Sequence, residues 1–172
     1  QAEHDENSQC ILISKDLKLI KEFQNKIKEK IKKLPRRSIA YKSLKNNGLI
    51  IFAKKNSDII NSINEIAPEH LEINISNPNK IINKVINVGS VCIGKYSPMA
   101  VTDYNAGTNH VLPTFGSAKF ASGLNVNEFY KKISYITLSK KGVEKIGESA
   151  THLAEYEELY GHALSIRSRM RR

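Results

Sequence analysis

Short apolar runs of strand length alternate with longer amphipathic runs over the first two-thirds of this chain. The clearest is residues 48–54, GLIIFAK, an uninterrupted apolar run that is typical of a strand buried on both faces of a parallel sheet. Similar runs occupy residues 10–16 (CILISKD), 70–76 (HLEINIS) and 88–94 (VGSVCIG). Parallel strands need crossover connections, so this alternation predicts an α/β fold, a partial Rossmann-like sheet with crossover helices.

The segments between these runs have helical patterns. Residues 17–34 place apolar side chains three and four positions apart, with lysine and glutamate on the other face, and Pro35 ends the pattern. A second helix is expected over residues 38–45. A third is expected over residues 57–66, with Ser57 as its N-cap.

The character of the chain changes after Pro113. Residues 119–124 predict a short helix, residues 126–138 fit a helix or a strand equally well, and residues 142–169 have a strong helical pattern. The sequence therefore predicts an α/β domain over residues 1–122 and a helical carboxyl-terminal region over residues 123–172.

The first segment, QAEHDENSQ, has the composition of the end of a helix whose start is missing. The first residue is Gln and not Met. We therefore expect this sequence to be part of a longer protein.

The overall composition is that of a globular protein. The chain has 172 residues, of which 40% are hydrophobic and 26% charged, and no apolar run has the length of a membrane-spanning helix. Its two cysteines, Cys10 and Cys92, both fall within apolar strand-like runs, which favours buried thiols in a reducing compartment. We therefore expect a cytoplasmic protein with no membrane partner.

The chain is strongly basic, with 27 Lys and Arg against 17 Asp and Glu, a formal net charge of +10. Such a surplus permits binding to nucleic acid. However, the lysines are spread along the expected helices, and no aromatic-interleaved basic patch or nucleic-acid-binding motif is present. We therefore expect no nucleic-acid partner.

Residues 96–114, YSPMAVTDYNAGTNHVLPT, follow an expected strand and are too irregular to predict a helix or a strand. They contain Asp103 and His110. Ligands bind beyond the carboxyl ends of parallel strands, so this loop is a candidate site. The alternative is a plain surface loop with a capping aspartate and a solvated histidine.

Three further places concentrate possible metal ligands or catalytic bases. These are Gln1 with His4, Glu69 with His70, and Glu157 with His162. Histidine and carboxylate are common ligands of zinc, and a catalytic zinc site keeps one position open. Each pair taken alone is more often structural, as a helix-surface pair, a cap or a turn. The isolated His152 is assigned no role.

Four segments resemble histidinol dehydrogenase, in the same order and with fitting separations. They are QAEHD (1–5), APEHLEI (67–73), SPMAVTDYNAGTNHVLPTFGSAKFASGL (97–124) and LAEYEELYGHALSIRSR (153–169). The chains of that family are more than twice as long, so the resemblance is to their carboxyl-terminal portion. It implies NAD-dependent oxidation of L-histidinol to L-histidine through L-histidinaldehyde, the last steps of histidine biosynthesis.

The resemblance also implies a role for each matching residue. The family binds one zinc ion per site, and the implied ligands are Gln1, His4, Asp103 and His162. Glu69 and His70 match the catalytic bases. His110 and Glu157 match residues of the substrate pocket, to which His70 and the four ligands also contribute. The family is a homodimer, the helical carboxyl-terminal region helps to form the dimer, and the residue matched by His162 crosses the interface.

These assignments agree with the chemistry of the side chains. Zinc would hold the imidazole and amine nitrogens of histidinol and so orient the carbinol carbon toward the nicotinamide. His70 would take the hydroxyl proton, and Glu69 would then activate water against the aldehyde. An anionic Glu157 would pair with the cationic nitrogen of the substrate. An amide ligand such as Gln1 is unusual for zinc, so we expect it to be weak and exchangeable.

The chain departs from the family pattern at three positions next to these residues. Thr102 replaces a usual glycine, Thr108 a usual proline and Glu158 a usual glycine. The family's NAD contacts lie in part outside the segments matched here, so no NAD-binding residue is assigned, and this chain alone is expected to be inactive.

Two other functions are compatible with the residues. One is an inactive remnant or basic binding module that retains a metal site; the intact ligand set favours the enzyme over it. The other is a zinc hydrolase that uses Glu69 as its base, and the absence of an HExxH motif argues against it.

Overall fold

The computed structural model describes residues 1–170, which form two compact units. The first is Gln1–Phe129 and the second begins at Tyr130. The units therefore divide after Phe129, whereas the sequence analysis placed the domain boundary after residue 122, and that boundary stays a prediction.

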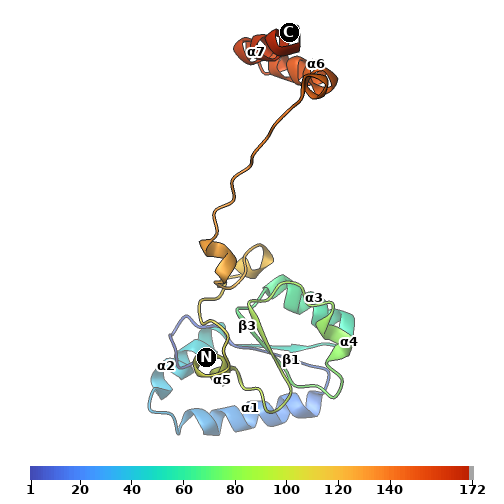
Figure 1. Ribbon diagram of the computed structural model, residues 1–172. Helices are drawn as coiled ribbons and strands as arrows, with labels where there is room; N and C mark the ends of the chain where they lie inside the picture. The colour runs from blue at the N-terminus through green and yellow to red at the C-terminus, as the bar shows by residue number, and fades with distance from the viewer. Residues whose placement is uncertain (171–172) are drawn as a thin grey trace. The chain divides into compact units, whose positions relative to one another are not determined.

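The first unit contains the expected alternation of strands and helices (Figure 1). In chain order its elements are β1 (Ile11–Ser14), α1 (Leu17–Ile31), α2 (Arg37–Asn47), β2 (Leu49–Phe52), α3 (Asn56–Ile66), β3 (His70–Ile73), α4 (Asn79–Ile82), β4 (Ser90–Ile93) and α5 (Met99–Tyr104). Each strand lies inside one of the four apolar runs, so the prediction of an α/β class is confirmed. Helices α1 and α3 lie on opposite sides of the strands in Figure 1.

The strands pair in parallel, as expected, but as two separate two-stranded sheets within the described residues. In one sheet β1 pairs with β2, and in the other β3 pairs with β4, with His70 opposite Ser90. The expectation that residues 48–54 are buried on both faces is wrong, since Leu49 is 48% and Phe52 43% exposed. A strand in a two-stranded sheet has one open edge and little to cover its ends. A larger Rossmann-like sheet stays a proposal.

Helix α3 ends in a way that directs the chain into β3. Ala67 is fully buried and adopts a left-handed conformation with φ +48°, and its N–H donates to Ile63 O at 2.8 Å. Pro68 then prevents further helix. The N-cap expected at Ser57 is wrong, because the helix begins at Asn56 and the Lys55 N–H donates to the Asp58 carboxylate at 3.0 Å.

The amino-terminal residues form turns on helix α2. The expected end of a helix is not observed there, since the described residues 1–9 contain turns only. Arg36 donates to His4 O at 3.2 Å, Lys42 pairs with Glu6 at 2.7 Å, and the buried Ser43 hydroxyl donates to Ser8 O at 2.7 Å. So short a segment lacks the turns needed for a stable helix and is held by these contacts instead.

The segment after β4 contains a helix that the sequence does not predict. The segment that follows lacks a helix that the sequence does predict. Helix α5 lies within the loop that was judged too irregular for a helix, which corrects that expectation. The helix expected over residues 119–124 is wrong, because only a short 3-10 turn forms, at Ser117–Lys119. The ambiguous residues 126–138 begin with a second 3-10 turn, Val126–Phe129, and continue without helix or strand.

The second unit is a pair of packed helices, α6 (Lys140–Tyr156) and α7 (Tyr160–Met170). The Ser139 hydroxyl caps α6 by accepting from Gly142 N at 3.0 Å. A Cβ atom at Gly147 would lie 2.5 Å from the Met170 sulfur, so the glycine lets the Met170 side chain pack closely against α6. The predicted helical content is confirmed, but residues 157–159 interrupt it.

The interruption depends on Glu158, which has φ +60°. This left-handed conformation is costly for a residue with a Cβ atom and free for glycine. Replacing Glu158 with glycine is therefore expected to raise the free energy of unfolding by about 0.5–1 kcal/mol. The relief of backbone strain stabilises the folded state, and the greater entropy that glycine gives the unfolded chain offsets part of that gain. Urea unfolding followed by circular dichroism measures this difference.

Glu148 supplies the control for that substitution, since it is an exposed residue within α6. Glu148→Gly is expected to lower the free energy of unfolding by about 1 kcal/mol, because glycine is a poor helix former. If Glu158→Gly and Glu148→Gly lowered the free energy of unfolding equally, the left-handed conformation of Glu158 would carry no strain.

Both cysteines are free thiols, as expected. Cys92 on β4 is buried, and burial raises the pKa of the Cys10 thiol, an effect that the nearby amino terminus partly offsets. Within the described residues, no helix has both the length and the apolar character needed to cross a membrane.

Candidate active site

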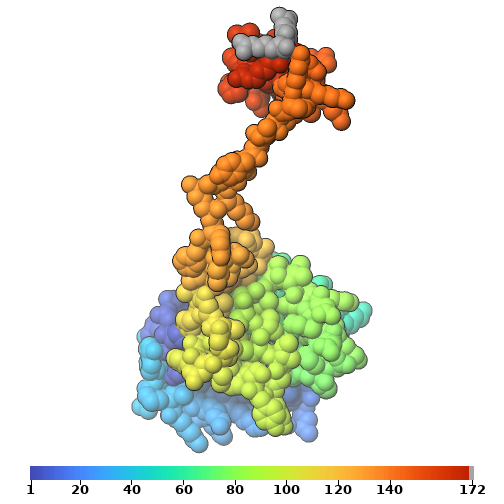
Figure 2. Space-filling view, in the orientation of Figure 1, coloured from blue at the N-terminus to red at the C-terminus, as the bar shows by residue number. Residues whose placement is uncertain are grey.

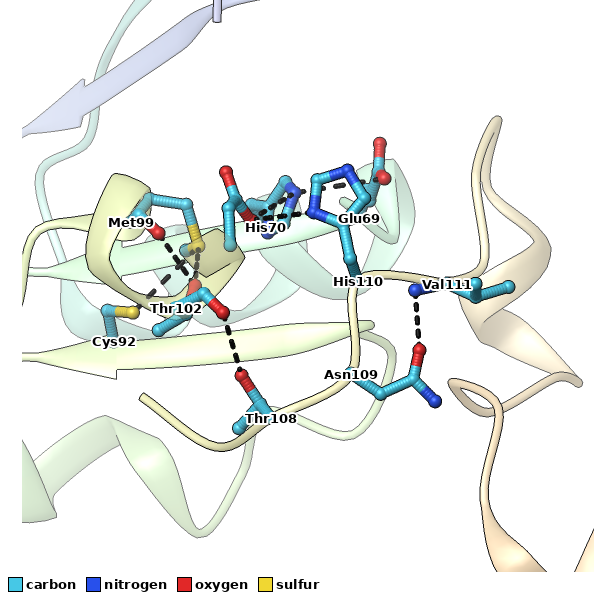
Figure 3. Close-up of polar contacts among 10 residues, drawn as sticks. Glu69, His70, Cys92, Met99, Thr102, Thr108, Asn109, His110 and Val111 are labelled. Carbon is cyan, nitrogen blue, oxygen red and sulfur yellow. Dashed lines mark hydrogen bonds and ion pairs between the residues drawn. The ribbon is translucent and has the colours of Figure 1, made fainter. Parts of the chain in front are cut away.

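Four side chains of the first unit gather at the start of β3 and in the loop after β4 (Figure 3). His70 Nε2 lies 3.7 Å from Glu69 Oε1 and 4.0 Å from Asp103 Oδ1. His110 Nδ1 lies 3.3 Å from the same Asp103 oxygen. The structure thus brings together Glu69, His70, Asp103 and His110, which the sequence placed in two separate segments.

The backbone at the beginning of the β3–β4 pair fixes Glu69 and His70. Gly89 N donates to Pro68 O at 3.0 Å, and Ser90 N donates to Glu69 O at 2.8 Å. A Cβ atom at Gly89 would lie 2.5 Å from Glu69 O, so any other residue would displace that backbone. The sequence alone does not mark Gly89 as part of a site, since it is only a glycine at the start of an apolar strand.

The loop that carries Asp103 is tied to the same sheet at both ends. Near its start the Thr102 hydroxyl donates to Met99 O at 2.7 Å, and the Met99 sulfur lies 3.8 Å from that of the buried Cys92 on β4. Near its end the buried Pro113 lies beside Gly89, with its Cδ 3.1 Å from where a Gly89 Cβ would be. Between these anchors the loop is at the surface of the first unit, in yellow in Figure 2.

The cluster is half-buried and contains both carboxylates and imidazoles. The His70 and Asp103 side chains are 13% and 19% exposed, Glu69 is 30% exposed and His110 59%. His70 Nδ1 is buried and has no hydrogen-bond partner among the described residues. A buried polar atom normally has one, so the unpaired nitrogen is more typical of a functional histidine than of a purely structural one. Such a set can move protons or contribute ligands to a metal ion.

The sequence matches the family model for histidinol dehydrogenase over residues 1–170. This chain belongs to the histidinol dehydrogenase family. The resemblance seen in its motifs is thereby confirmed.

Individual proteins of known family support the same assignment. The histidinol dehydrogenase of Pelagibacter ubique is 56% identical over all of this chain, and that of Methanocaldococcus jannaschii is 44% identical over 99% of it. A crystal structure of the enzyme from Elizabethkingia anophelis matches 99% of the chain at 35% identity with a TM-score of 0.82, and 39% of that structure is covered. The chain spans about 40% of the length of the curated relatives it matches.

The remaining residues that the histidinol dehydrogenase resemblance implicates lie elsewhere in the chain. Gln1 and His4 are exposed on the amino-terminal turn, where His4 N donates to Gln1 O at 3.1 Å. In the second unit Glu157 ends α6, and His162 on α7 lines a surface hollow with Gly161, Ser165 and Ile166. Within residues 1–170, no three His, Cys, Asp or Glu side chains are grouped so as to hold a metal ion.

Proposed function

We propose that this chain carries the catalytic bases and the zinc ligands of an NAD-dependent histidinol dehydrogenase. The reaction is the oxidation of L-histidinol to L-histidine through L-histidinaldehyde. The observation that carries the proposal is the cluster of Glu69, His70, Asp103 and His110, formed in a chain of this family.

His70 is the base of the first step. Its Nε2 faces two carboxylate oxygens, those of Glu69 and Asp103, at 3.7 and 4.0 Å. When this nitrogen takes the hydroxyl proton as hydride leaves for NAD, the imidazolium ion is stabilised by both negative charges. Neither carboxylate is close enough to form a short hydrogen bond with the ring, which leaves Nε2 open to the substrate hydroxyl.

Glu69 is the base of the second step. It lies next to His70 and is more exposed, so water reaches it more easily. Its carboxylate takes a proton from the water that attacks the aldehyde, and the resulting hydrate anion loses the second hydride to another NAD, which leaves the carboxylic acid.

Zinc is proposed to bind Gln1, His4, Asp103 and His162. Imidazole nitrogen and carboxylate oxygen are usual zinc ligands, and the exposed His4 and His162 rings are both accessible, so the donor set fits the ion. Bound zinc supplies a Lewis acid that holds the substrate nitrogens. His110 and Glu157 complete the substrate pocket with His70 and the ligands.

We further propose that the active protein is a cytoplasmic homodimer in which His162 is contributed by the partner copy. The exposed position of His162 on α7 leaves its ring free for such a contact. Nucleic acid and membranes are not part of the proposed function.

A chimera tests the proposal. The part of the Pelagibacter ubique enzyme that this chain does not match would be joined to the present 172 residues. With zinc, NAD and L-histidinol the chimera is expected to form two NADH per histidinol, followed by ultraviolet absorbance. The 172-residue chain alone is expected to form none, because it spans only 40% of that relative.

His162→Ala in the chimera is expected to abolish the zinc-dependent activity and leave a folded dimer, as judged by light scattering. A folded chimera that binds zinc but forms no NADH would favour the alternative of a remnant with a metal site. Full activity of the His162→Ala variant would remove that residue from the site.

A further inference from the structure

His110 is the most exposed member of the cluster, and among the described residues its ring pairs with Asp103 alone. An exposed side chain held by a single contact loses that contact readily, because rotation of the ring costs little. The position of His110 must therefore come from the backbone on either side of it. The two preceding residues, Thr108 and Asn109, make the contacts that fix this backbone.

Thr108 joins the segment before His110 to the helix that carries Asp103. Its hydroxyl donates to Thr102 O at 3.3 Å, and Thr102 directly precedes Asp103 (Figure 3). The two departures from the family pattern in this loop are thus in contact with each other. The hydrogen bond fixes the distance between the Asp103 and His110 backbones across the loop.

Asn109 fixes the backbone after His110. Its side-chain oxygen accepts from Val111 N at 2.6 Å, and its side-chain nitrogen donates to Leu124 O. Leu124 N in turn donates to Val111 O at 2.9 Å. One amide side chain therefore links the residues on both sides of His110 to a segment further along the chain.

The close approach of the Leu124 segment is favoured by its neighbour Gly123, which has no side chain. A Cβ atom at Gly123 would lie 2.8 Å from Leu112 Cδ2 and 3.3 Å from Val111 O. Gly123, Asn109 and Leu124 thus form a brace for the loop.

We propose that Thr108 and Asn109 are positioning residues that hold His110 against Asp103. The inference rests on the proposed function for its effect on zinc, because Asp103 is a proposed ligand. Neither residue touches the reacting atoms; both act through the backbone that carries His110.

The test uses the 172-residue chain with Thr108→Val, Thr108→Ser and Asn109→Ala. The matched controls are Thr114→Val and Asn105→Ala, which alter the same residue types in the same loop. Within residues 1–170 the hydroxyl of Thr114 and the side-chain amide of Asn105 have no hydrogen bond, and both residues are exposed. The readouts are the ring-nitrogen resonances of His110, the amide exchange of Val111 and Leu124, and zinc affinity by chelator competition.

Thr108→Val and Asn109→Ala are expected to shift the His110 resonances toward those of Asp103→Asn. Thr108→Val is also expected to speed amide exchange at Val111 and Leu124 and to weaken zinc binding, each about three- to tenfold, the loss of one net hydrogen bond. Asn109→Ala removes two hydrogen bonds, so about ten- to a hundredfold is expected for the same two quantities. Thr108→Ser should restore all three values. Thr108→Val added to Asp103→Asn should not shift the His110 resonances further, since Thr108 acts on them through the contact between His110 and Asp103, which Asp103→Asn already alters.

Unchanged His110 resonances in both disruptive variants would overturn the proposal, as would equal shifts in the two controls. If neither the wild-type chain nor the wild-type chimera binds zinc, the proposed metal site fails, and the resonances and amide exchange still decide the positioning role. If the wild-type chain binds zinc and the variants bind it equally well with unshifted resonances, only the positioning role fails.

Discussion

Asp103→Asn is expected to weaken zinc binding by the chain at least about 100-fold, since removing even an outer partner of a ligand costs 10–100-fold. Asp103 lies 3.3 Å from His110 and 4.0 Å from His70, so its charge serves two imidazoles as well as the proposed metal. The amide keeps the shape of the side chain, removes its charge and replaces one acceptor oxygen with an NH2 donor. Chelator competition measures the zinc affinity, and the urea midpoint shows whether the fold is retained.

Asp58→Asn is the matched control for that prediction. Asp58 is exposed and accepts from Lys55 N at the start of α3, and an amide oxygen can accept the same bond. Its zinc affinity should equal that of the wild-type chain. Equal zinc affinities for Asp103→Asn and the wild type would show that Asp103 is not a ligand.

The strands and the long helices follow from sequence because their signals are local. The run CILIS contains β1, and the three- and four-residue spacing after it contains α1, which Asp16 caps by accepting from Lys18 N and Leu19 N. What could not be predicted depends on distant partners. The turns of residues 1–9 are held by Lys42 and Ser43 on α2 and by Arg36 just before it, which no local pattern reveals.

The individual residues of the candidate site could be predicted from the sequence, but their arrangement in space could not. Asp103 and His70 meet at the amino-terminal end of the β3–β4 pair, where His70 begins β3 opposite Ser90. The expectation of a site beyond the carboxyl ends of the strands is therefore wrong for this cluster, because α5, which carries Asp103, packs back against β3. The brace of Asn109 could not be predicted, since its partner Leu124 lies in a segment expected to be helical. The ligand roles of Gln1, His4 and His162 came from the family resemblance and remain predictions.

His70→Gln in the chimera is expected to lower kcat for histidinol oxidation about 10²- to 10⁴-fold, the usual contribution of a positioned general base. Glutamine fills a similar volume and can donate and accept hydrogen bonds, but it cannot take a proton at neutral pH. Zinc affinity should change little, because His70 is not among the proposed ligands. Steady-state NADH formation gives kcat, and chelator competition gives the metal affinity.

His152→Gln is the control, since His152 is an exposed histidine of α6 to which no role is assigned. Its kcat should be unchanged. Two further outcomes separate the roles of the cluster. A loss of zinc from His70→Gln would make His70 a ligand and not a base. An unchanged kcat in His70→Gln, together with a large loss in Glu69→Gln, would make Glu69 the base of both steps, which its position 3.7 Å from His70 Nε2 also permits.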